Sequence, residues 1–276
     1  MKDLQYISEE RCEHDTILYD YTHAAYNSNI PIVGKLRSSN IFYNSFTDSK
    51  KLVPLVRETT GEDATIWGIK LVNHKLYYEL YFYKENMIKE YSAIDLIAGL
   101  KKYIHIDVNS HIPCDNFMFS VDVNNQISTG IHVYLATGND NSGVSYYFKG
   151  DNIRLENIYT FYDPKYNYTK LVRDVKESAF SDINSDNLNN VLIPELINCK
   201  NICRGRKQGC DSIYFSGINI DQFLYFLKRF DYPRAIVQFI EDRKSDLDHL
   251  QYDVGFDYTL LGGELIINKS GYYGTF

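Results

Sequence analysis

The feature that most constrains the fold is a hairpin pattern that occurs five times along the chain. Each time, two stretches alternate apolar and polar residues with a period of two, and turn-forming residues separate them. The turns are Asn73-His74, the polar run NNQISTG, Lys149-Gly150-Asp151, Lys207-Gln208-Gly209 and Leu261-Gly262-Gly263. The pattern predicts ten strands, at residues 64–72, 75–83, 116–123, 131–136, 144–149, 153–161, 200–206, 211–218, 250–259 and 263–269.

Segments with apolar residues at helical spacing lie between these hairpins. They are MIKEYSAIDLIAGLKKYI, KLVRDVKESAF, NLNNVLIPELI, and IDQFLYFLKRF, after which Pro233 stops the helix before RAIVQFIED. Residues 1–50 also read as helical or irregular. No linker, low-complexity tract or charge block divides the chain, which predicts a single domain over residues 1–276.

A repeated unit of hairpin and helix buries its apolar surface best in a closed sheet with helices outside, because closure removes unpaired strand edges. The residues predicted to face outward are all apolar: Trp67, Ile69, Leu71, Phe117, Phe119, Val121, Ile131, Val133, Ile213 and Phe215. The residues predicted to face inward are polar or aromatic: Lys70, Tyr77, Glu79, Tyr81, Ser120, Asp122, His132, Tyr134, Arg204, Arg206, Tyr214 and Ser216. We therefore predict an α+β fold, a closed antiparallel ten-stranded β-barrel with a polar and aromatic lumen, surrounded by helices.

Composition excludes several classes of protein. The chain of 276 residues is 44% hydrophobic and 24% charged, and no apolar run approaches the roughly 20 residues that span a bilayer. A net charge of -7 argues against wholesale nucleic-acid binding. The five scattered cysteines argue against a disulfide framework, and the acidic start shows no export signal, so a cytoplasmic location is expected. The sequence contains no GxSxG motif, no HExxH motif and no glycine-rich phosphate loop, so it shows none of these hydrolase signatures.

Four stretches carry a resemblance to a known family: FMFSVDVNNQISTGIHVYL, SYYFKGDNIRLENIYTFYDPK, SIYFSGIN and QYDVGFDYTLLGGELIINKSGYYGTF. In pattern and order, over roughly residues 55–276, the chain resembles the cyanobactin-type peptide prenyltransferases. The resemblance implies a prenyltransferase barrel of repeated α-α-β-β units. It also implies transfer of an isoprenoid, dimethylallyl or geranyl, from an allylic diphosphate, with magnesium, to a side chain or terminus of a ribosomally made peptide.

The implied chemistry can be matched with the predicted lumen. A leaving diphosphate needs fixed cations and hydrogen-bond donors, and the expected ones are Lys70, His132, Tyr134, Arg204, Arg206 and Tyr214. An allylic cation needs electron-rich faces that exclude water, and the expected wall is Tyr77, Tyr81, Tyr83 and Tyr147. Asp122 is the expected metal ligand.

The family's catalytic glutamate lies on the first strand of the first hairpin, where this chain has Ile66. A two-residue turn in that hairpin pairs Gly68 with Glu79, so Glu79 faces the same lumen one pair away. We predict Glu79 as the base. A slipped register in which Glu62 or Asp63 serves, and a barrel without transferase activity, are alternatives.

Each candidate also has a structural reading. Lys70 is also consistent with a solvated lysine at a strand edge, and Arg204 and Arg206 with a basic surface patch beside a turn. His132 is consistent with a structural histidine, and Asp122 with a buried, hydrogen-bonded aspartate. The tyrosines suit barrel filling.

Two functions therefore compete with peptide prenylation. One is a non-catalytic protein on the same barrel that captures a phosphate-bearing small molecule or nucleotide; the other is an interaction protein whose lumen is plugged by side chains. A monomer is expected in each case, because a closed barrel has no free sheet edge.

Overall fold

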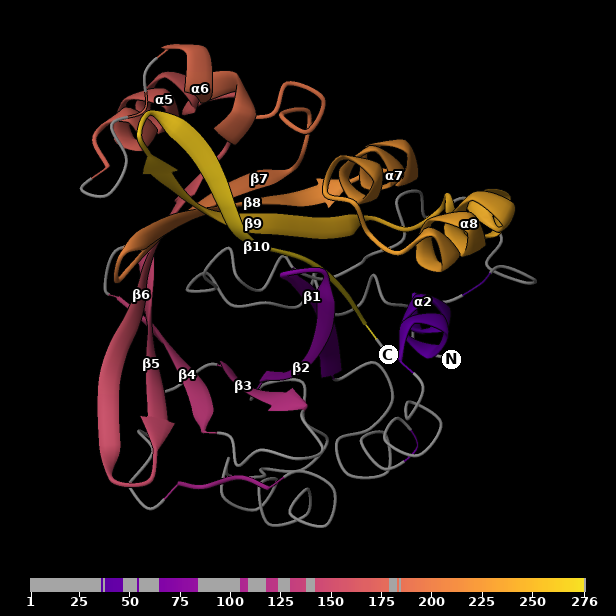
Figure 1. Cartoon of the computed structure of the whole chain (residues 1–276), viewed down its shortest axis with the longest axis horizontal. Coiled ribbons are helices and arrows are strands. Elements are labelled where there is room, and N and C mark those ends of the chain that lie inside the picture. The colour runs from indigo at the N-terminus through magenta and orange to yellow at the C-terminus, as the bar shows by residue number, and fades with distance from the viewer. Residues whose placement is uncertain are drawn as a thin grey trace.

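The computed structural model describes residues 36, 38–46, 54, 65–83, 105–108, 118–123, 130–137, 142–178, 183 and 185–275. Ten strands in this part of the chain form one closed antiparallel barrel (Figure 1). Each strand pairs with its neighbours in sequence, and the last pairs with the first. The strands are β1 (Thr65–Val72), β2 (Lys75–Tyr83), β3 (Met118–Val123), β4 (Ile131–Ala136), β5 (Ser142–Lys149), β6 (Asn152–Tyr162), β7 (Asn201–Lys207), β8 (Cys210–Ile218), β9 (Tyr252–Leu261) and β10 (Glu264–Thr275). The predicted ten-stranded closed barrel is confirmed.

The hairpin of β1 and β2 has the register that its turn dictates. Asn73 and His74 both have positive φ, 49° and 60°, as a two-residue turn matched to the twist of the strands requires. Gly68 therefore lies opposite Glu79, as predicted, and no slip occurs.

Strand β10 is longer than predicted, because its glycines are not turn residues. It continues to Thr275, where the sequence predicted an end at residue 269. A Cβ at Gly274 would lie 2.1 Å from the ring of Trp67 on β1, so glycine is needed there for a close approach. This contact helps β10 close the barrel on β1.

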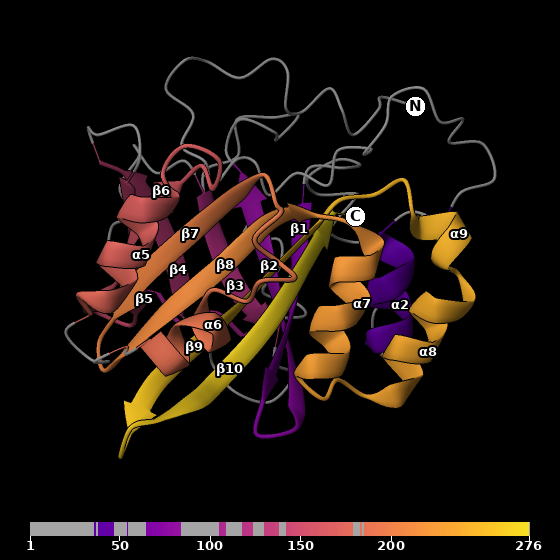
Figure 2. The ribbon, with the colours of Figure 1, turned by 90° about the horizontal axis from the view of Figure 1, so that it is seen from above.

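Helices lie outside the barrel (Figure 2). They are α2 (Ser39–Ser45), α5 (Tyr168–Lys176), α6 (Ser185–Val191), α7 (Ile220–Arg229), α8 (Arg234–Asp242) and α9 (Lys244–Leu247). The side chain of Asn219 caps α7 by accepting hydrogen bonds from the backbone N–H groups of Asp221 and Gln222. None of the helices in the described ranges is both long and apolar enough to cross a membrane. The helix predicted over MIKEYSAIDLIAGLKKYI and most of residues 1–50 lie outside the described residues, so the single domain over 1–276 stays a prediction.

The outer face of the sheet and the inner faces of the helices share the main hydrophobic core. The predicted outward residues belong to it, except Phe117, which lies outside the described residues. On α7, Phe223 stacks on Tyr252 of β9 with ring centroids 4.4 Å apart. A second, separate apolar cluster lies inside the barrel. The sheet therefore divides the molecule into an outer core and a lumen.

Candidate active site

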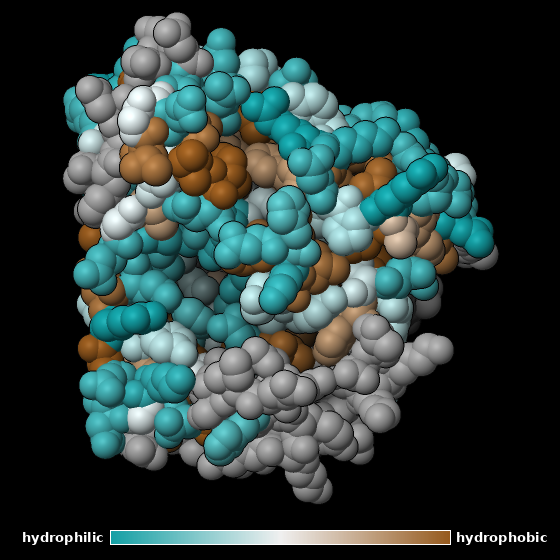
Figure 3. All heavy atoms as spheres, in the orientation of Figure 1, coloured by the Kyte–Doolittle hydropathy of each residue, from teal (hydrophilic) through white to brown (hydrophobic). Residues whose placement is uncertain are grey.

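The lumen contains about 630 Å³ of free space, part of it at its opening. Figure 3 shows a hollow in the surface among hydrophilic residues, in the orientation in which Figure 1 looks into the barrel. The lining residues come from eight of the ten strands: Ile66, Lys70, Glu79, Tyr81, Met118, His132, Tyr134, Glu156, Asn157, Tyr159, Lys207, Tyr214, Lys269 and Tyr273. The charged side chains and the aromatic side chains form two adjoining groups in this lumen, which we call the charged level and the aromatic level.

Glu79 of β2 lies where the two levels meet, and its side chain is only 2% exposed. Its carboxylate accepts hydrogen bonds from the hydroxyl of Ser120, at 2.5 Å, and from that of Tyr81, at 2.7 Å, and it forms an ion pair with Lys70. Burial is the largest single effect and opposes ionisation, but the charge and hydrogen bond of Lys70 together with the charge of His132 outweigh it, so the pKa of Glu79 is lowered. Glu79 is therefore an ionised carboxylate in a largely dry setting.

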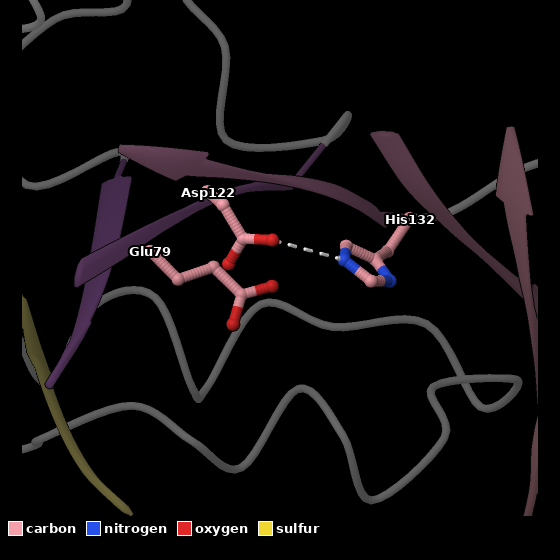
Figure 4. A group of neighbouring side chains, drawn as sticks. All are labelled: Glu79, Asp122 and His132. Carbon is pink, nitrogen blue, oxygen red and sulfur yellow. Dashed lines mark ion pairs between the residues drawn. The ribbon is translucent and has the colours of Figure 1, made fainter. Parts of the chain in front are cut away.

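A second group of charges centres on His132 of β4 (Figure 4). Its Nδ1 lies 2.5 Å from a carboxylate oxygen of Glu156, and its Nε2 lies 3.7 Å from Oδ2 of Asp122. Burial alone would lower the pKa of His132, but the nearby carboxylates of Asp122 and Glu156 raise it to about 9. The ring is therefore a cation at neutral pH.

Two lysines share one carboxylate on the other side of the lumen. Asp257 of β9 lies 2.8 Å from Nζ of Lys207 and 3.1 Å from Nζ of Lys269. Burial and the neighbouring charge of Lys207 lower the pKa of Lys269 to about 8. Each ammonium has three donors, so this pair keeps hydrogen-bonding capacity beyond what one carboxylate accepts.

The aromatic level lies next to these charges. Its members are the inner apolar cluster: Ile66, Met118, Tyr134, Tyr159, Phe161, Cys203, Tyr214 and Tyr273, with Tyr81 packed against them. The ring centroids of Tyr81 and Tyr273 are 5.7 Å apart, and those of Tyr134 and Tyr159 are 6.2 Å apart. Burial raises the pKa of each of these four phenols, so they stay neutral and present electron-rich faces to the cavity.

Comparison with known proteins gives the fold a name. The structure matches the 5-dimethylallyl tryptophan synthase of Streptomyces coelicolor, in complex with DMASPP and Trp, with a TM-score of 0.53 and 8% identity over 88% of this chain and 90% of that one. It also matches the NotF prenyltransferase (TM-score 0.50, 10% identity, 86% of this chain and 89% of that one) and the apo form of the prenyltransferase PriB (0.50, 8%, 86% and 92%). The chain has the fold of a prenyltransferase barrel. No family model and no curated protein matches it.

At this level of identity the likeness concerns the fold, and the chemistry has to be argued from the residues of this barrel. Four of the predicted site residues line the lumen together with Glu79: Lys70, His132, Tyr134 and Tyr214. Tyr81 also lines it and bonds to Glu79.

Two predicted wall tyrosines lie away from the cavity lining. Tyr77, next to the turn of the first hairpin, is 42% exposed. The ring of Tyr147 lies 4.8 Å from that of His132, and Arg154 lies 4.8 Å from the centre of the Tyr147 ring. Tyr83 is on β2, but its side chain is outside the described residues. Tyr159 and Tyr273, which the sequence analysis did not select, complete the wall instead.

Arg204 and Arg206 do not face the lumen of the prenyltransferase barrel, and their predicted inward placement is wrong. Along β7, Ile202 lies in the outer core, and residues two and four positions later share its face. Arg204 is 3% exposed and lies 3.9 Å from a carboxylate oxygen of Asp211 on β8. Arg206 is exposed. The alternation places Cys203 and Lys207 inside the barrel.

Four charged residues of the lumen were therefore not predicted from the sequence: Lys207, Lys269, Glu156 and Asp257, the carboxylate that the two lysines share. Lys207 was assigned to a turn, although the apolar Ile202 on the same strand fixes which residues face inward. Lys269 was placed at the end of its strand, which continues beyond it. Glu156 faces inward because a β-bulge opposite Ser145 and Tyr146 of β5 turns both Glu156 and Asn157 into the cavity. No glycine or proline in the sequence of β6 indicates that bulge.

The magnesium that the resemblance implies has one candidate site among the described residues. Ligand atoms of Glu79, Asp122 and His132 lie within 4.8 Å of one another. However, Lys70 pairs with both carboxylates, at 3.3 Å for Asp122, and the imidazole is itself a cation. Mg²⁺ prefers oxygen ligands and several waters. These residues therefore do not fit a resident magnesium ion, since the ammonium of Lys70 already takes the cation's position.

Proposed function

We propose that this protein transfers an isoprenoid from an allylic diphosphate to an acceptor in the lumen. One observation supports this most strongly. An ionised, buried carboxylate, Glu79, lies between a level of ammonium groups and a level of tyrosine rings. Allylic transfer requires these three elements side by side: cations for the leaving group, π-faces for the carbocation and a base for the acceptor's proton.

The diphosphate is proposed to bind at Lys207 and Lys269. These two ammonium groups share one carboxylate, so they offer donors to phosphate oxygens and gain a counter-charge from them. Tyr214 adds a hydroxyl 3.4 Å from Nζ of Lys207. Lys70 and His132, which are held by carboxylates in the absence of substrate, contribute the positive field around the leaving group.

The prenyl chain then extends along the tyrosine level. When the C1–O bond of the diphosphate breaks, the oxygen keeps the electron pair, and the faces of Tyr81, Tyr134 and Tyr273 stabilise the allylic cation by roughly 0.5 to 2 kcal/mol each. The acceptor attacks C1, and its proton passes to Glu79. The hydrogen bonds from Ser120 and Tyr81 orient that carboxylate.

The finer identity of the substrates belongs to the same proposal. The resemblance supports a ribosomally made peptide as acceptor and dimethylallyl or geranyl as the transferred group. Because the carboxylates beside Lys70 do not fit a resident metal ion, no step of the proposed reaction depends on magnesium.

A mass-spectrometric screen tests this function. Dimethylallyl and geranyl diphosphates are incubated with free tryptophan and with short peptides that offer Tyr, Trp, Arg, His, Ser and free termini, with and without Mg²⁺. We expect one acceptor to gain the mass of one isoprenoid, with the gain lost in Glu79→Gln and kept in Glu264→Gln, which removes an exposed carboxylate on β10. No gain on any acceptor would contradict transferase activity.

A binding protein is the second candidate, and Ile66 at the position of the family's glutamate favours it. It predicts saturable, stabilising binding of an allylic diphosphate analogue with no product on any acceptor. Thermal unfolding in the presence of the analogue, measured beside the product screen, separates the two functions.

A further inference from the structure

The linker that precedes the hairpin of β5 and β6 is too short to hold the covering helices for which other linkers have room. Residues 84–117 precede β3, residues 163–200 precede β7, and residues 219–251 precede β9, and each stretch is long enough for two helices. Only residues 137–141 separate β4 from β5. The hairpin of β5 and β6 thus enters the barrel with no covering helices of its own.

The outer face of β6, the second strand of this hairpin, is exposed in part, although Phe148 on the same face of β5 is buried in the outer core. Ile153, Leu155 and Ile158 of β6 point outward and are 51%, 47% and 44% exposed. By contrast, Trp67, Val121 and Ile213, which point outward from β1, β3 and β8, are completely buried. We call the row of Ile153, Leu155 and Ile158 the bare face. Figure 3 shows hydrophobic residues along the edge of the molecule where β6 runs in Figure 1.

The bare face is suited to an α-helix. It runs from residue 153 to residue 158, about 16 Å at 3.3 Å per residue, which is the length of roughly ten helical residues. Elsewhere in this barrel an amphipathic helix performs the same task, as α7 does when Phe223 packs on Tyr252 and Tyr272. The apolar area offered is on the order of 300 Å², well below the roughly 800 Å² per partner of a stable dimer, so a second copy is a poor occupant.

Basic residues at one end of the bare face indicate which end of a bound helix should be acidic. Ile158 pairs with Arg206 across β6 and β7, and Arg206 is exposed on the same outer face. Beyond this end, α5 adds Lys170, which lies 5.7 Å from the centre of the Tyr162 ring; Arg173 on the same helix is already paired with Asp174, at 3.1 Å. Acidic side chains at this end of a bound helix would be matched.

We propose that the bare face is a docking site for an amphipathic helix of a second polypeptide, about three turns long, with aliphatic residues at i, i+3, i+4 and i+7 and acidic residues near Arg206. The helix takes the place of the covering layer that residues 137–141 are too short to supply. The face lies on the opposite side of the sheet from the lumen, so docking leaves the cavity open and is independent of the reaction proposed above.

A labelled peptide tests this inference. The probe is a fluorescein-labelled 14-residue peptide with leucines at i, i+3, i+4 and i+7 and glutamates at one end, and its scrambled isomer is the control. Fluorescence anisotropy should show saturable binding of the probe alone. Leu155→Glu should weaken it by at least about tenfold, a typical loss for a central apolar anchor. Leu261→Glu, at a leucine that is 74% exposed on another hairpin, should leave it within about twofold.

The charge match has its own test. Arg206→Glu should weaken the acid-ended probe more than a probe that carries lysines in place of the glutamates. Equal binding of the scrambled isomer, equal losses in the Leu155 and Leu261 variants, or no saturable binding would overturn the proposal. So would a sedimentation mass of a dimer that Leu155→Glu converts to a monomer, because a second copy would then cover the face. Unchanged thermal unfolding of each variant shows that the fold is intact.

Discussion

Replacing Lys207 by methionine tests the proposed diphosphate site directly. The substitution keeps most of the side chain's length and removes one ammonium from the lumen. Asp257 keeps its contact with Lys269, at 3.1 Å, so the change does not leave a buried carboxylate unpaired and the fold should persist. A charge-assisted hydrogen bond contributes about 1.5 to 3 kcal/mol. We therefore expect the dissociation constant for a diphosphate to rise about 10- to 150-fold.

The assay is isothermal titration with dimethylallyl S-thiolodiphosphate, which cannot be turned over readily, and with inorganic pyrophosphate, both at fixed ionic strength. Arg206→Met is the matched control. It removes the same charge from the adjacent position of β7, but on the outer face, and should change the affinity less than about twofold because solvent screens an exposed charge. An equal loss of affinity in the two variants would refute the proposal that the inner face of β7 binds the diphosphate and the outer face does not. No loss of affinity in Lys207→Met would remove this lysine from the site.

Three further predictions follow from the lumen. The folded pKa of His132, about 9, lies above the ordinary 6.5, so the stability from its charge is complete below pH 6.5 and lost as the pH rises to 9. From pH 6.5 to 7.5, where Lys269, with a pKa of about 8, is still mostly protonated, the unfolding free energy should fall by about 1 kcal/mol in the wild type, as measured by urea denaturation, and stay nearly level in His132→Gln. EDTA should change neither thermal unfolding nor the affinity for the thiolodiphosphate beyond about twofold, because Lys70 takes the cation's position; a tenfold loss restored by Mg²⁺ would contradict this. Met118→Ala, in a residue that lines the cavity, should favour geranyl over dimethylallyl diphosphate by roughly tenfold in competitive binding, and an unchanged ratio would place the prenyl chain elsewhere.

The sequence predicted the first hairpin down to its register, because two adjacent positive-φ residues leave only one pairing of the strands. From that register Glu79 and Lys70 follow as neighbours in the lumen. The closed barrel follows from the alternation of the remaining strands, since each has an apolar outer face that requires cover.

The errors have physical causes that alternation does not reveal. On β7, Cys203 and Gly205 face inward, so the lumen side has only one charged residue, whereas the outer side carries two arginines. A rule that places charged residues inward and apolar residues outward therefore puts the two arginines in the lumen. Ile202 lies on the same face as the arginines and belongs to the outer core, so it indicates the opposite orientation. Arg204 is tolerated in the outer core because Asp211 lies beside it. Tertiary pairing of this kind depends on a residue in another strand.

The β-bulge in β6 has a consequence for how such barrels are compared. Before it, even-numbered residues face the lumen, and after it odd-numbered ones do, as Glu156, Asn157 and Tyr159 show. An alignment that treats β6 as an unbroken strand would match lumen residues of one barrel with outer residues of another. Two barrels with the same cavity would then share little apparent identity along this strand. Transplanting a substrate pocket between prenyltransferase barrels accordingly requires counting residues from the bulge rather than from the turn.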